Sequence, residues 1–257
     1  MKHDVVSRET WLKARQALLV KEKAHTRAND QLNAERRALP WVKVEKTYEF
    51  DGPDGKVTLA DLFGGRSQLF VKHYMMGPGQ QHHCVGCAFE VDHVQGTLVH
   101  LQNHDVSYVA IARAPIEEIE AMRHRMGWQF PFVSSYRSDF NYDFNVSFTP
   151  EQMASKTAFY NFRETDPGLE DLSGDSVFYK DEQGQIFHTY SVFGRGCEMF
   201  LGIYPFLDVM PKGRAEHGPH HSLGDWVRPH DMYGRHGTVE PTGRYHPEAC
   251  ACSMHKP

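Results

Sequence analysis

The residues best suited to chemistry are two cysteines in the run Cys84-Val85-Gly86-Cys87. A cysteine thiolate is both a nucleophile and a ligand for soft metal ions. Two thiols separated by two residues can close a disulfide within one helical turn or share one metal ion. The spacing therefore predicts either redox chemistry or a metal site.

The sequence around the pair favours redox chemistry. Residues 68–76 are apolar and aromatic, which predicts a buried strand, and a Gly/Pro loop leads from it to Cys84. From Cys84 to about Asn103, apolar residues recur at helical spacing. Cys84 is thus expected at a helix N-terminus, where free N–H groups and the helix dipole favour a thiolate. We expect Cys84 to be the nucleophile and Cys87 to be the resolving thiol.

Three other side chains are candidates to support the dithiol. His82 and His83 directly precede it, where an imidazolium would stabilise the thiolate and a neutral imidazole would accept its proton. The alternative is that both face water in the loop. Arg113 follows a second predicted strand and would add positive charge near the cysteines, or else form a surface ion pair.

The metal alternative uses the same cysteines together with a second group of ligands near the C-terminus. Zinc or copper would be bound by thiolate and imidazole groups. The candidate ligands are His82, His83, Cys84, Cys87, His246, Cys250, Cys252 and His255. Their spacing matches no strong zinc signature, and a His-rich tail without metal explains the terminal group equally. The primary interpretation has no cofactor. Cys197 is expected at a later helix start, as a packed or a reactive thiol.

Composition restricts the class of protein and its compartment. The chain has 257 residues, of which 40% are hydrophobic, enough for a sizeable core. Its net charge of -5 predicts no broad basic surface for nucleic acid. No apolar run approaches the roughly 20 residues of a membrane helix, and the first residues lack an apolar signal core. We therefore expect a cytoplasmic protein, and in that reducing compartment a closely spaced cysteine pair is more often redox-active or metal-binding than structural.

The predicted elements around the cysteines follow a recognisable order. A strand at 68–76, a helix from Cys84 and a strand at 106–112 form a βαβ unit, and a helix runs from Pro115 to Gly127. Residues 176–180 and 186–191 flank a turn and predict a hairpin, and a helix is expected from about 197 to 207. The order βαβ then ββα predicts an α/β protein with a thioredoxin-like fold.

Three regions are expected along the chain. Residues 1–40 are an N-terminal helical arm, with a helix over 7–38 that packs on the core or on a second subunit, so a homodimer is compatible with it. Residues 41–210 are the thioredoxin-like domain, with an aromatic-rich insertion at 141–172. Asp139 and Asp143 are buried acids only if this aromatic segment covers the cysteines. Residues 211–257 are an irregular, surface-wrapping and partly disordered tail.

Several longer motifs resemble a known family over about Ser7 to Tyr233. They are Cys84-Val85-Gly86-Cys87, Arg113-Ala114-Pro115, Met126-Gly127-Trp128-Gln129-Phe130-Pro131, Ser138-Asp139-Phe140-Asn141-Tyr142-Asp143-Phe144, Phe187-His188-Thr189-Tyr190-Ser191 and Trp226-Val227-Arg228-Pro229-His230-Asp231. They resemble an uncharacterised bacterial thioredoxin-like family, a domain of unknown function described as a predicted dithiol-disulfide oxidoreductase. The resemblance implies redox chemistry at Cys84 and Cys87.

Two positions differ from thioredoxins themselves. His83 stands where thioredoxins carry a tryptophan before the first cysteine, and Asp175-Ser176 stand where their cis-proline precedes the hairpin strand. Since that proline segment docks peptide substrates, a small-molecule thiol, disulfide or peroxide fits these departures at least as well as a protein disulfide.

Overall fold

The structure is a computed structural model that describes residues 3–80 and 84–248. It divides into two compact units, residues 1–41 and 42–257. The first unit is helix α1 (Arg8–Arg37), which Ser7 caps by accepting a hydrogen bond from the Thr10 N–H. The predicted helix is therefore present. Its apolar side chains Trp11, Leu18 and Leu19 are all exposed. That they pack on the core or on a second subunit stays a prediction.

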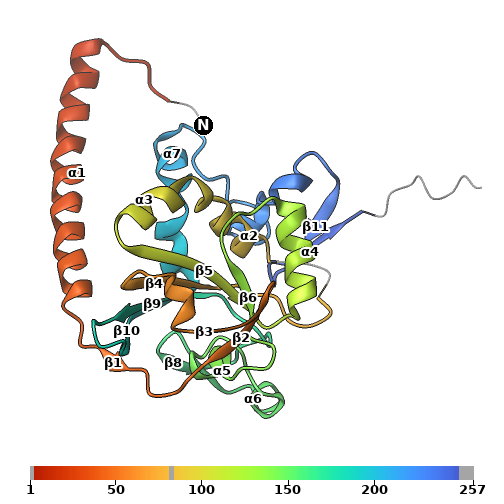
Figure 1. The fold of residues 1–257 in the computed structure, drawn as a ribbon. Coiled ribbons are helices and arrows are strands. Elements are labelled where there is room, and N and C mark those ends of the chain that lie inside the picture. Colours follow the sequence, from red (N-terminus) through yellow and green to blue (C-terminus); the bar gives the residue numbers. More distant parts are fainter. Residues whose placement is uncertain (1–2, 81–83, 249–257) are drawn as a thin grey trace, which may run out of the picture. The chain divides into compact units, whose positions relative to one another are not determined.

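The second unit is built around one eight-stranded sheet, whose strands are named here in chain order (Figure 1). They are β1 (Val42–Lys43), β2 (Glu49–Gly52), β3 (Gly55–Thr58), β4 (Gln68–His73), β5 (Val106–Ala112), β6 (Phe132–Ser134), β9 (Gly174–Lys180) and β10 (Ile186–Phe193). Two small antiparallel pairs lie outside this sheet: β7 (Ala158–Tyr160) with β8 (Arg163–Thr165), and β11 (Gly237–Val239) with β12 (Tyr245–Pro247).

The helices of this unit are short. The α-helices are α2 (Val85–Asp92), α3 (Leu98–Asn103), α4 (Ile116–Met126), α5 (Phe140–Asp143), α6 (Pro150–Ser155) and α7 (Tyr204–Val209). The 3₁₀ turns are η1 (Asp61–Phe63), η2 (Gln95–Thr97), η3 (Gly194–Phe200), η4 (Leu223–Asp225) and η5 (His230–Met232). No helix in the described residues has both the length and the apolar composition needed to cross a membrane.

Strand order confirms the thioredoxin-like fold. The sheet runs β1-β10-β9-β4-β5-β6-β2-β3, so its centre is β10-β9-β4-β5. β4 is parallel to β5 with α2 between them in the chain, and β9 pairs antiparallel with both β4 and β10. This is the predicted βαβ unit extended by a hairpin. β1 and β6 were not predicted, because runs of two and three residues carry no readable alternation.

Two predicted helices are broken in the structure. The helix expected over 84–103 is α2, η2 and α3, and the break falls at the exposed residues 95–97, where Gly96 disfavours helix. The helix expected over 197–207 is η3 followed by α7. Gly194, Gly196 and Gly202 weaken the first part, whereas Pro205 lies in the first turn of α7, which tolerates its missing N–H.

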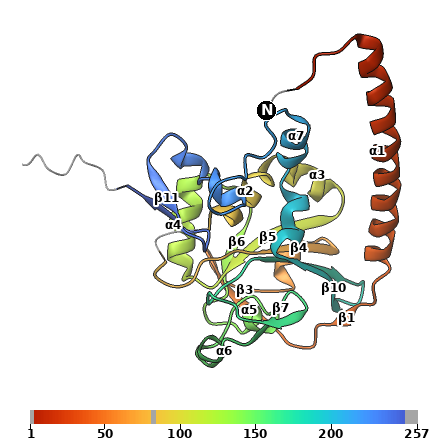
Figure 2. The ribbon, with the colours of Figure 1, turned by 180° about the vertical axis from the view of Figure 1, so that it is seen from behind.

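The sheet has a different core on each face. Along β5, Tyr108, Ala110 and Ala112 pack with α2 and α4, whereas Val109 and Ile111 pack with η1 and α5. This alternation follows from the two-residue period of a strand. Figures 1 and 2 show α2 and α3 on one side of the sheet and α5 and α6 on the other.

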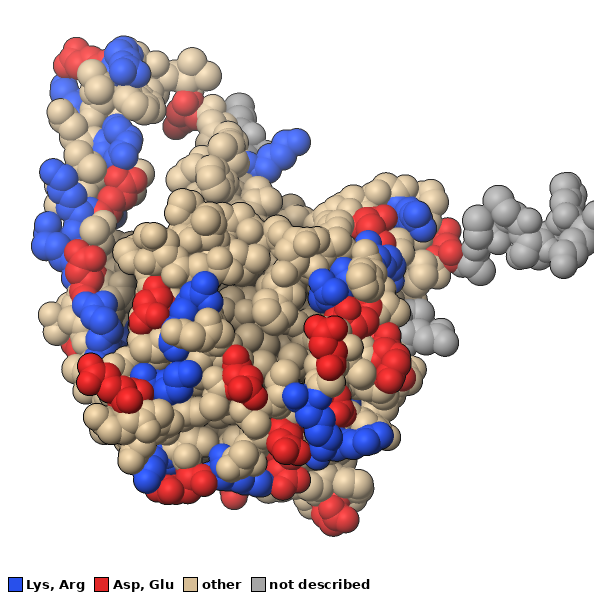
Figure 3. Space-filling model, viewed as in Figure 1, with Lys and Arg blue, Asp and Glu red and all other residues tan. Residues whose placement is uncertain are grey.

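The aromatic insertion therefore does not cover the cysteines. Asp139 and Asp143, considered above as buried acids, lie at α5 on the face opposite α2. Both are exposed rather than buried, and they accept hydrogen bonds from Lys46, at 2.7 Å and 2.8 Å. On the face shown in Figure 3, basic and acidic side chains of the described residues are interspersed.

Residues 211–248 contribute to a core beside α2. Val227, Val239 and Tyr245 are buried and pack with Val85 and Phe89 of α2. This third cluster was not predicted, because its members are isolated apolar residues among Gly, Pro and His.

Gly174 provides a test of the packing between β9 and β10. A Cβ at this position would lie 2.5 Å from the Phe193 ring, whereas a Cβ at the exposed Gly96 would meet no atom within 4 Å. We expect Gly174→Ala to lower the free energy of unfolding by about 1–3 kcal/mol through overpacking. Gly96→Ala is the matched control and should not lower this free energy, because alanine favours helix over glycine by up to about 1 kcal/mol. Equal effects in urea denaturation would show that the Gly174 contact can relax.

Candidate active site at Cys84 and Cys87

Cys84 is the N-cap residue of α2. Its backbone is extended, with φ −61° and ψ 117°, and its Sγ accepts a hydrogen bond from the Cys87 N–H at 3.4 Å. Gly86 leaves room beside the sulfur, since a Cβ there would lie 3.7 Å from Sγ. Both thiols are free; Cys84 is partly exposed and Cys87 is buried. The sequence thus predicted the position of the dithiol at the helix start.

The two thiols have opposite acidities. A hydrogen bond from the Cys87 thiol lowers the pKa of Cys84 to about 7, although burial acts in the opposite direction. The backbone N–H groups of Cys87 and Gly86 and the charge of Lys72 lower this pKa further. Burial, and then the neighbouring Cys84, raise the pKa of Cys87 well above its usual range. The Cys84 thiol is therefore the more acidic of the two, and the Cys87 thiol is the more strongly protonated.

A buried ion cluster lies next to the dithiol and was not predicted. Lys72 has an exposed side-chain fraction of 0%. Its Nζ lies 2.6 Å from Glu90 Oε2, 3.5 Å from Asp175 Oδ1 and 2.8 Å from Ser173 Oγ. Burial opposes the ammonium charge, but Asp175 and Glu90 outweigh it and raise the pKa of Lys72 well above its usual range. Burial also raises the pKa of Glu90 well above its usual range, with Lys72 opposing.

Local structure explains why these residues meet. Lys72 is paired with Asp175 across β4 and β9, so both side chains lie on the α2 face of the sheet. Glu90 follows Cys87 by three residues and so shares its side of α2. The sequence did contain an indication of this cluster. Lys72 lies within an otherwise apolar predicted strand, and a lysine at a buried position is expected to be paired with a carboxylate.

The third cysteine lies near the same cluster. Cys197 is buried in η3, and its Sγ lies within 4.8 Å of ligand atoms of both Glu90 and Asp175. Burial raises its pKa well above its usual range. Within residues 3–80 and 84–248, these three form the one group with metal-binding geometry. The group does not suit a divalent ion, because the Lys72 ammonium already supplies the cation that the carboxylates need.

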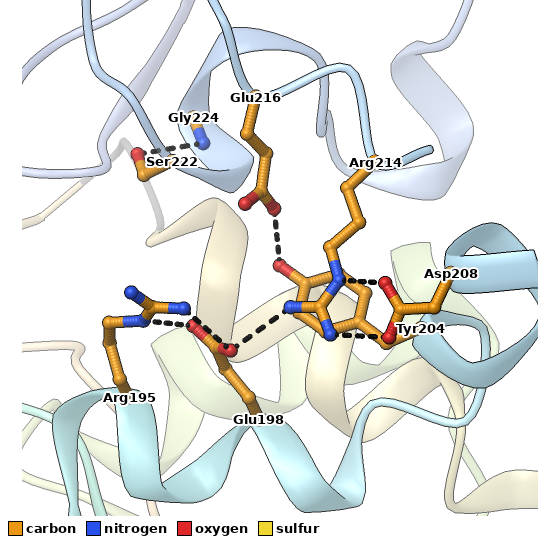
Figure 4. Close-up of polar contacts among 8 residues, drawn as sticks. All are labelled: Arg195, Glu198, Tyr204, Asp208, Arg214, Glu216, Ser222 and Gly224. Atoms are coloured by element: carbon orange, nitrogen blue, oxygen red, sulfur yellow. Dashed lines mark hydrogen bonds and ion pairs between the residues drawn. The ribbon is translucent and has the colours of Figure 1, made fainter. Parts of the chain in front are cut away.

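A cavity of about 200 Å³ opens onto the dithiol, and Cys84, Cys87, Glu90 and Cys197 all line it. A polar network surrounds its mouth (Figure 4). Glu198 accepts hydrogen bonds from Arg195 at 2.7 Å and from Arg214 at 3.1 Å. Arg214 also binds Asp208 at 2.6 Å and stacks on the Tyr204 ring. Glu216 is held by the Tyr204 hydroxyl at 2.7 Å. Charged side chains, Arg195, Glu198 and Glu216, therefore line part of this cavity.

The C-terminal region also contacts the dithiol. The Val85 N–H donates to the Gly243 carbonyl at 2.8 Å, and Cys84 and Arg244 form an isolated antiparallel bridge. A Cβ at Gly243 would lie 3.6 Å from Cys84 Sγ. The chain near 243–244 therefore covers part of the approach to the Cys84 sulfur.

The other predicted site residues do not join Cys84 among the described residues. Arg113 binds Asp171 at 2.8 Å and Glu170 at 3.0 Å, and it does not line the dithiol cavity. The positive charge near Cys84 comes from Lys72 instead. His246 forms an ion pair with Glu240. His82, His83, Cys250, Cys252 and His255 lie outside the described residues, so their proposed roles stay predictions.

Comparison with known families identifies the chain. A family described as "Bacterial protein of unknown function (DUF899)" matches residues 1–233. The chain belongs to this family. No curated protein matches the sequence. The contact between Gly243 and α2 lies beyond the matched residues.

Solved structures with similar folds include peroxiredoxins. Peroxidoxin BcpB from Mycobacterium tuberculosis is 12% identical, with a TM-score of 0.41 over 64% of this chain and 94% of that one. Peroxiredoxin Q from Xanthomonas campestris is 12% identical, with a TM-score of 0.44 over 65% and 94%. The mitochondrial 2-Cys peroxiredoxin of Plasmodium falciparum is 14% identical, with a TM-score of 0.39 over 65% and 92%. Likeness at this level carries no argument about activity.

Lys72 should be essential to stability. Lys72→Met leaves two buried carboxylates without their cation, and we expect it to lower the free energy of unfolding by about 3–5 kcal/mol. The matched control is Lys56→Met, which breaks a pair with Glu49 whose side chains are about 60% exposed; it should cost less than about 1 kcal/mol. Urea denaturation measures both. A loss at Lys72 no larger than at Lys56 would contradict the buried-cluster interpretation.

Proposed function

We propose that this protein is a cytoplasmic thiol-based oxidoreductase in which Cys84 is the nucleophile and Cys87 is the resolving thiol. The observation that carries the proposal is the N-cap position of Cys84, where the Cys87 thiol and two backbone N–H groups lower its pKa to about 7. At neutral pH about half of such a thiol is thiolate, compared with a few per cent of a thiol with a pKa near 8.5.

The reaction with a disulfide has two steps. The Cys84 thiolate attacks one sulfur of the substrate, forms a mixed disulfide and releases the other sulfur as a thiolate, which takes up a proton. Cys87 then loses its proton, attacks the Cys84 sulfur and releases the second substrate thiol. The substrate gains two electrons and the protein is left with a Cys84–Cys87 disulfide. An external thiol must reduce this disulfide to restore the protein.

A peroxide would follow the same route. The Cys84 thiolate attacks one peroxide oxygen, releases an alcohol or water after protonation, and becomes a sulfenic acid. Cys87 condenses with the sulfenic acid and water leaves. The cavity of about 200 Å³ favours a small disulfide or peroxide over a folded protein substrate.

Glu90 is the group best placed to accept the proton of Cys87 and to return it. It follows Cys87 by one helical turn, lines the same cavity and has a pKa raised well above its usual range. A carboxyl group beside a thiol can accept its proton and return it. A soft-metal function is not proposed, because the possible ligands beside the dithiol, Glu90, Asp175 and Cys197, already surround the Lys72 ammonium.

The pH dependence of alkylation tests the nucleophile. Because the thiolate is the reactive form, the rate at Cys84 should rise with pH, reach half its maximum near pH 7 and level off above pH 8. Mapping modified peptides by mass spectrometry assigns the rate to Cys84. The matched control is the same cysteine in urea-unfolded protein, where the midpoint should return to about 8.5. A native midpoint at or above the unfolded one would contradict the proposal.

Substitution of the cysteines tests their roles. We expect Cys84→Ser to abolish reduction of small disulfides and peroxides, and Cys87→Ser to accumulate a mixed disulfide or sulfenic acid on Cys84 that mass spectrometry detects. Cys197→Ser is the control and should retain turnover, because this thiol has a raised pKa. Full turnover in both Cys84→Ser and Cys87→Ser would show that the site is misassigned.

A further inference from the structure

A second cavity, of about 410 Å³, lies on the other face of the central sheet. Consecutive residues of β4 show the separation: Lys72 points toward Glu90 on α2, whereas His73 stacks against Phe140 and Phe144 at α5. Phe144 also lines the second cavity, which is therefore on the α5 face. It includes none of the residues that line the dithiol cavity.

A buried hydrogen-bond chain leads from the core into this cavity. His73 Nε2 lies 2.8 Å from Ser176 Oγ, Ser176 Oγ lies 2.8 Å from Ser191 Oγ, and Ser191 Oγ lies 2.7 Å from His188 Nε2. His73 and Ser176 are buried, and His188 and Ser191 line the cavity. The hydrogen-bond chain thus ends at His188 and Ser191, in a cavity that several phenylalanine rings also line.

The fold places this polar pair through an irregularity in β10. Residues three apart in a regular strand point to opposite faces. The register between β9 and β10 shifts between His188 and Tyr190, as at a β-bulge, and this brings His188 and Ser191 to the same face. Bulges of this kind often redirect a side chain beside a functional site.

The Tyr190 carbonyl fixes the direction of these hydrogen bonds. A carbonyl oxygen only accepts, so His188 Nε2–H donates to it at 3.0 Å and shares this proton with Ser191 Oγ. The hydroxyls of Ser191 and Ser176 then donate in turn toward His73 Nε2. In this tautomer His188 Nδ1 is an acceptor, and it has no hydrogen-bond partner among the described residues. A ligand hydroxyl can donate to this nitrogen.

An unusual turn supplies part of the cavity wall. Asn161 and Phe162 connect β7 to β8, and both have positive φ angles, 50° and 62°. Glycine is the usual residue at the second of these positions, and a phenylalanine there is strained. The Phe162 ring lies 5.5 Å from Phe193 and is 67% exposed, so little burial offsets the strain. Strain retained in this way is typical of functional sites.

The charges around the cavity are balanced. Lys46 is bound to Asp143 at 2.8 Å, and Lys43 is bound to Glu45 at 3.4 Å. The lining therefore offers no free charge for an ion. Phenylalanine rings supply much of the apolar wall, together with Val42 and Val44, and Asn145 and Asn161 also line the cavity; the phenylalanines are Phe144, Phe159, Phe162 and Phe193.

We propose that this cavity binds a neutral aromatic compound of one or two rings that carries a hydroxyl group, with the hydroxyl on His188 Nδ1 and the rings among the phenylalanines. A cavity of this volume is in the range of small-molecule sites. The site is separate from the dithiol and does not depend on the redox function proposed above.

Binding of 2-naphthol tests the proposal. Ligand-observed NMR should show saturable binding to the full-length protein, with a dissociation constant on the order of 0.1–1 mM for a ligand of this size. Two related compounds test the chemical class. 2-Methylnaphthalene lacks the hydroxyl and should bind more weakly, and naphthalene-2-sulfonate carries a charge and should not compete. Tighter binding of the sulfonate, or no saturable binding of 2-naphthol up to several millimolar, would overturn the proposal.

Variants place the ligand in the cavity. His188→Phe keeps a ring of similar shape and should weaken 2-naphthol binding about fivefold, while binding of 2-methylnaphthalene changes little. Ser191→Ala serves as the second variant of the same chain if His188→Phe does not fold. Phe162→Gly suits the left-handed backbone, so it should keep the melting temperature close to the parent's while weakening both ligands. Cys84→Ser, in the other cavity, should bind 2-naphthol as the parent does. Binding that is unchanged in His188→Phe and Phe162→Gly, or lost in Cys84→Ser, would place the ligand elsewhere and refute the site.

Discussion

The pairing of Lys72 with Glu90 and Asp175 joins the three elements on which the dithiol depends. Lys72 is on β4, the strand that leads to the cysteines; Glu90 is on α2, the helix that begins at Cys84; and Asp175 is on β9, the first strand of the hairpin. An ammonium without exposed surface is tolerable only when carboxylates are held against it. The packing of α2 on the sheet therefore depends on the same charged side chains that lie beside Cys87.

The same cluster explains the unequal acidity of the thiols. Cys84 lies at the helix start, where N–H groups and the Lys72 charge favour its thiolate, while burial keeps Cys87 protonated. In the proposed thiol exchange this asymmetry would set the order of the steps, with the partly exposed Cys84 thiolate attacking first and the buried Cys87 thiol resolving. The tail segment at Gly243 is hydrogen-bonded to Val85, so the access route to Cys84 includes residues far away in the chain.

Strand alternation divides the sheet into two sites. Lys72 and Asp175 point to the α2 face, whereas their neighbours His73 and Ser176 point to the α5 face and begin the hydrogen-bond chain to His188. A single residue of register shift in β4 or β9 would exchange the two sets. The buried polar groups on both faces therefore fix the register of the hairpin against the parallel strands.

Prediction from the sequence succeeded where one segment carries its own signal. Helix α1, strands β4 and β5, the hairpin β9–β10 and the N-terminal position of Cys84 all have apolar periodicity, turn residues or capping residues within a short window. The sequence was less informative at β1 and β6, at Gly96 within the predicted long helix, and in the C-terminal segments around Val227 and Tyr245. At β1, β6 and the C-terminal segments the deciding interactions come from residues distant in the chain, whereas at Gly96 one glycine ends a pattern that otherwise reads as helix.

The sequence by itself determined the fold class, the family resemblance and the dithiol, because the Cys84–Cys87 spacing and the βαβ-ββα order are local patterns. Only the tertiary structure decided which charges and hydrogen bonds surround these residues. It placed Lys72 rather than Arg113 beside the dithiol, moved Asp139 and Asp143 to the opposite face, and joined His73 to His188 through two serines on different strands. The physical reason is that strand order, register and a β-bulge determine which side chains meet across the sheet, and these depend on packing between segments rather than on sequence within one segment.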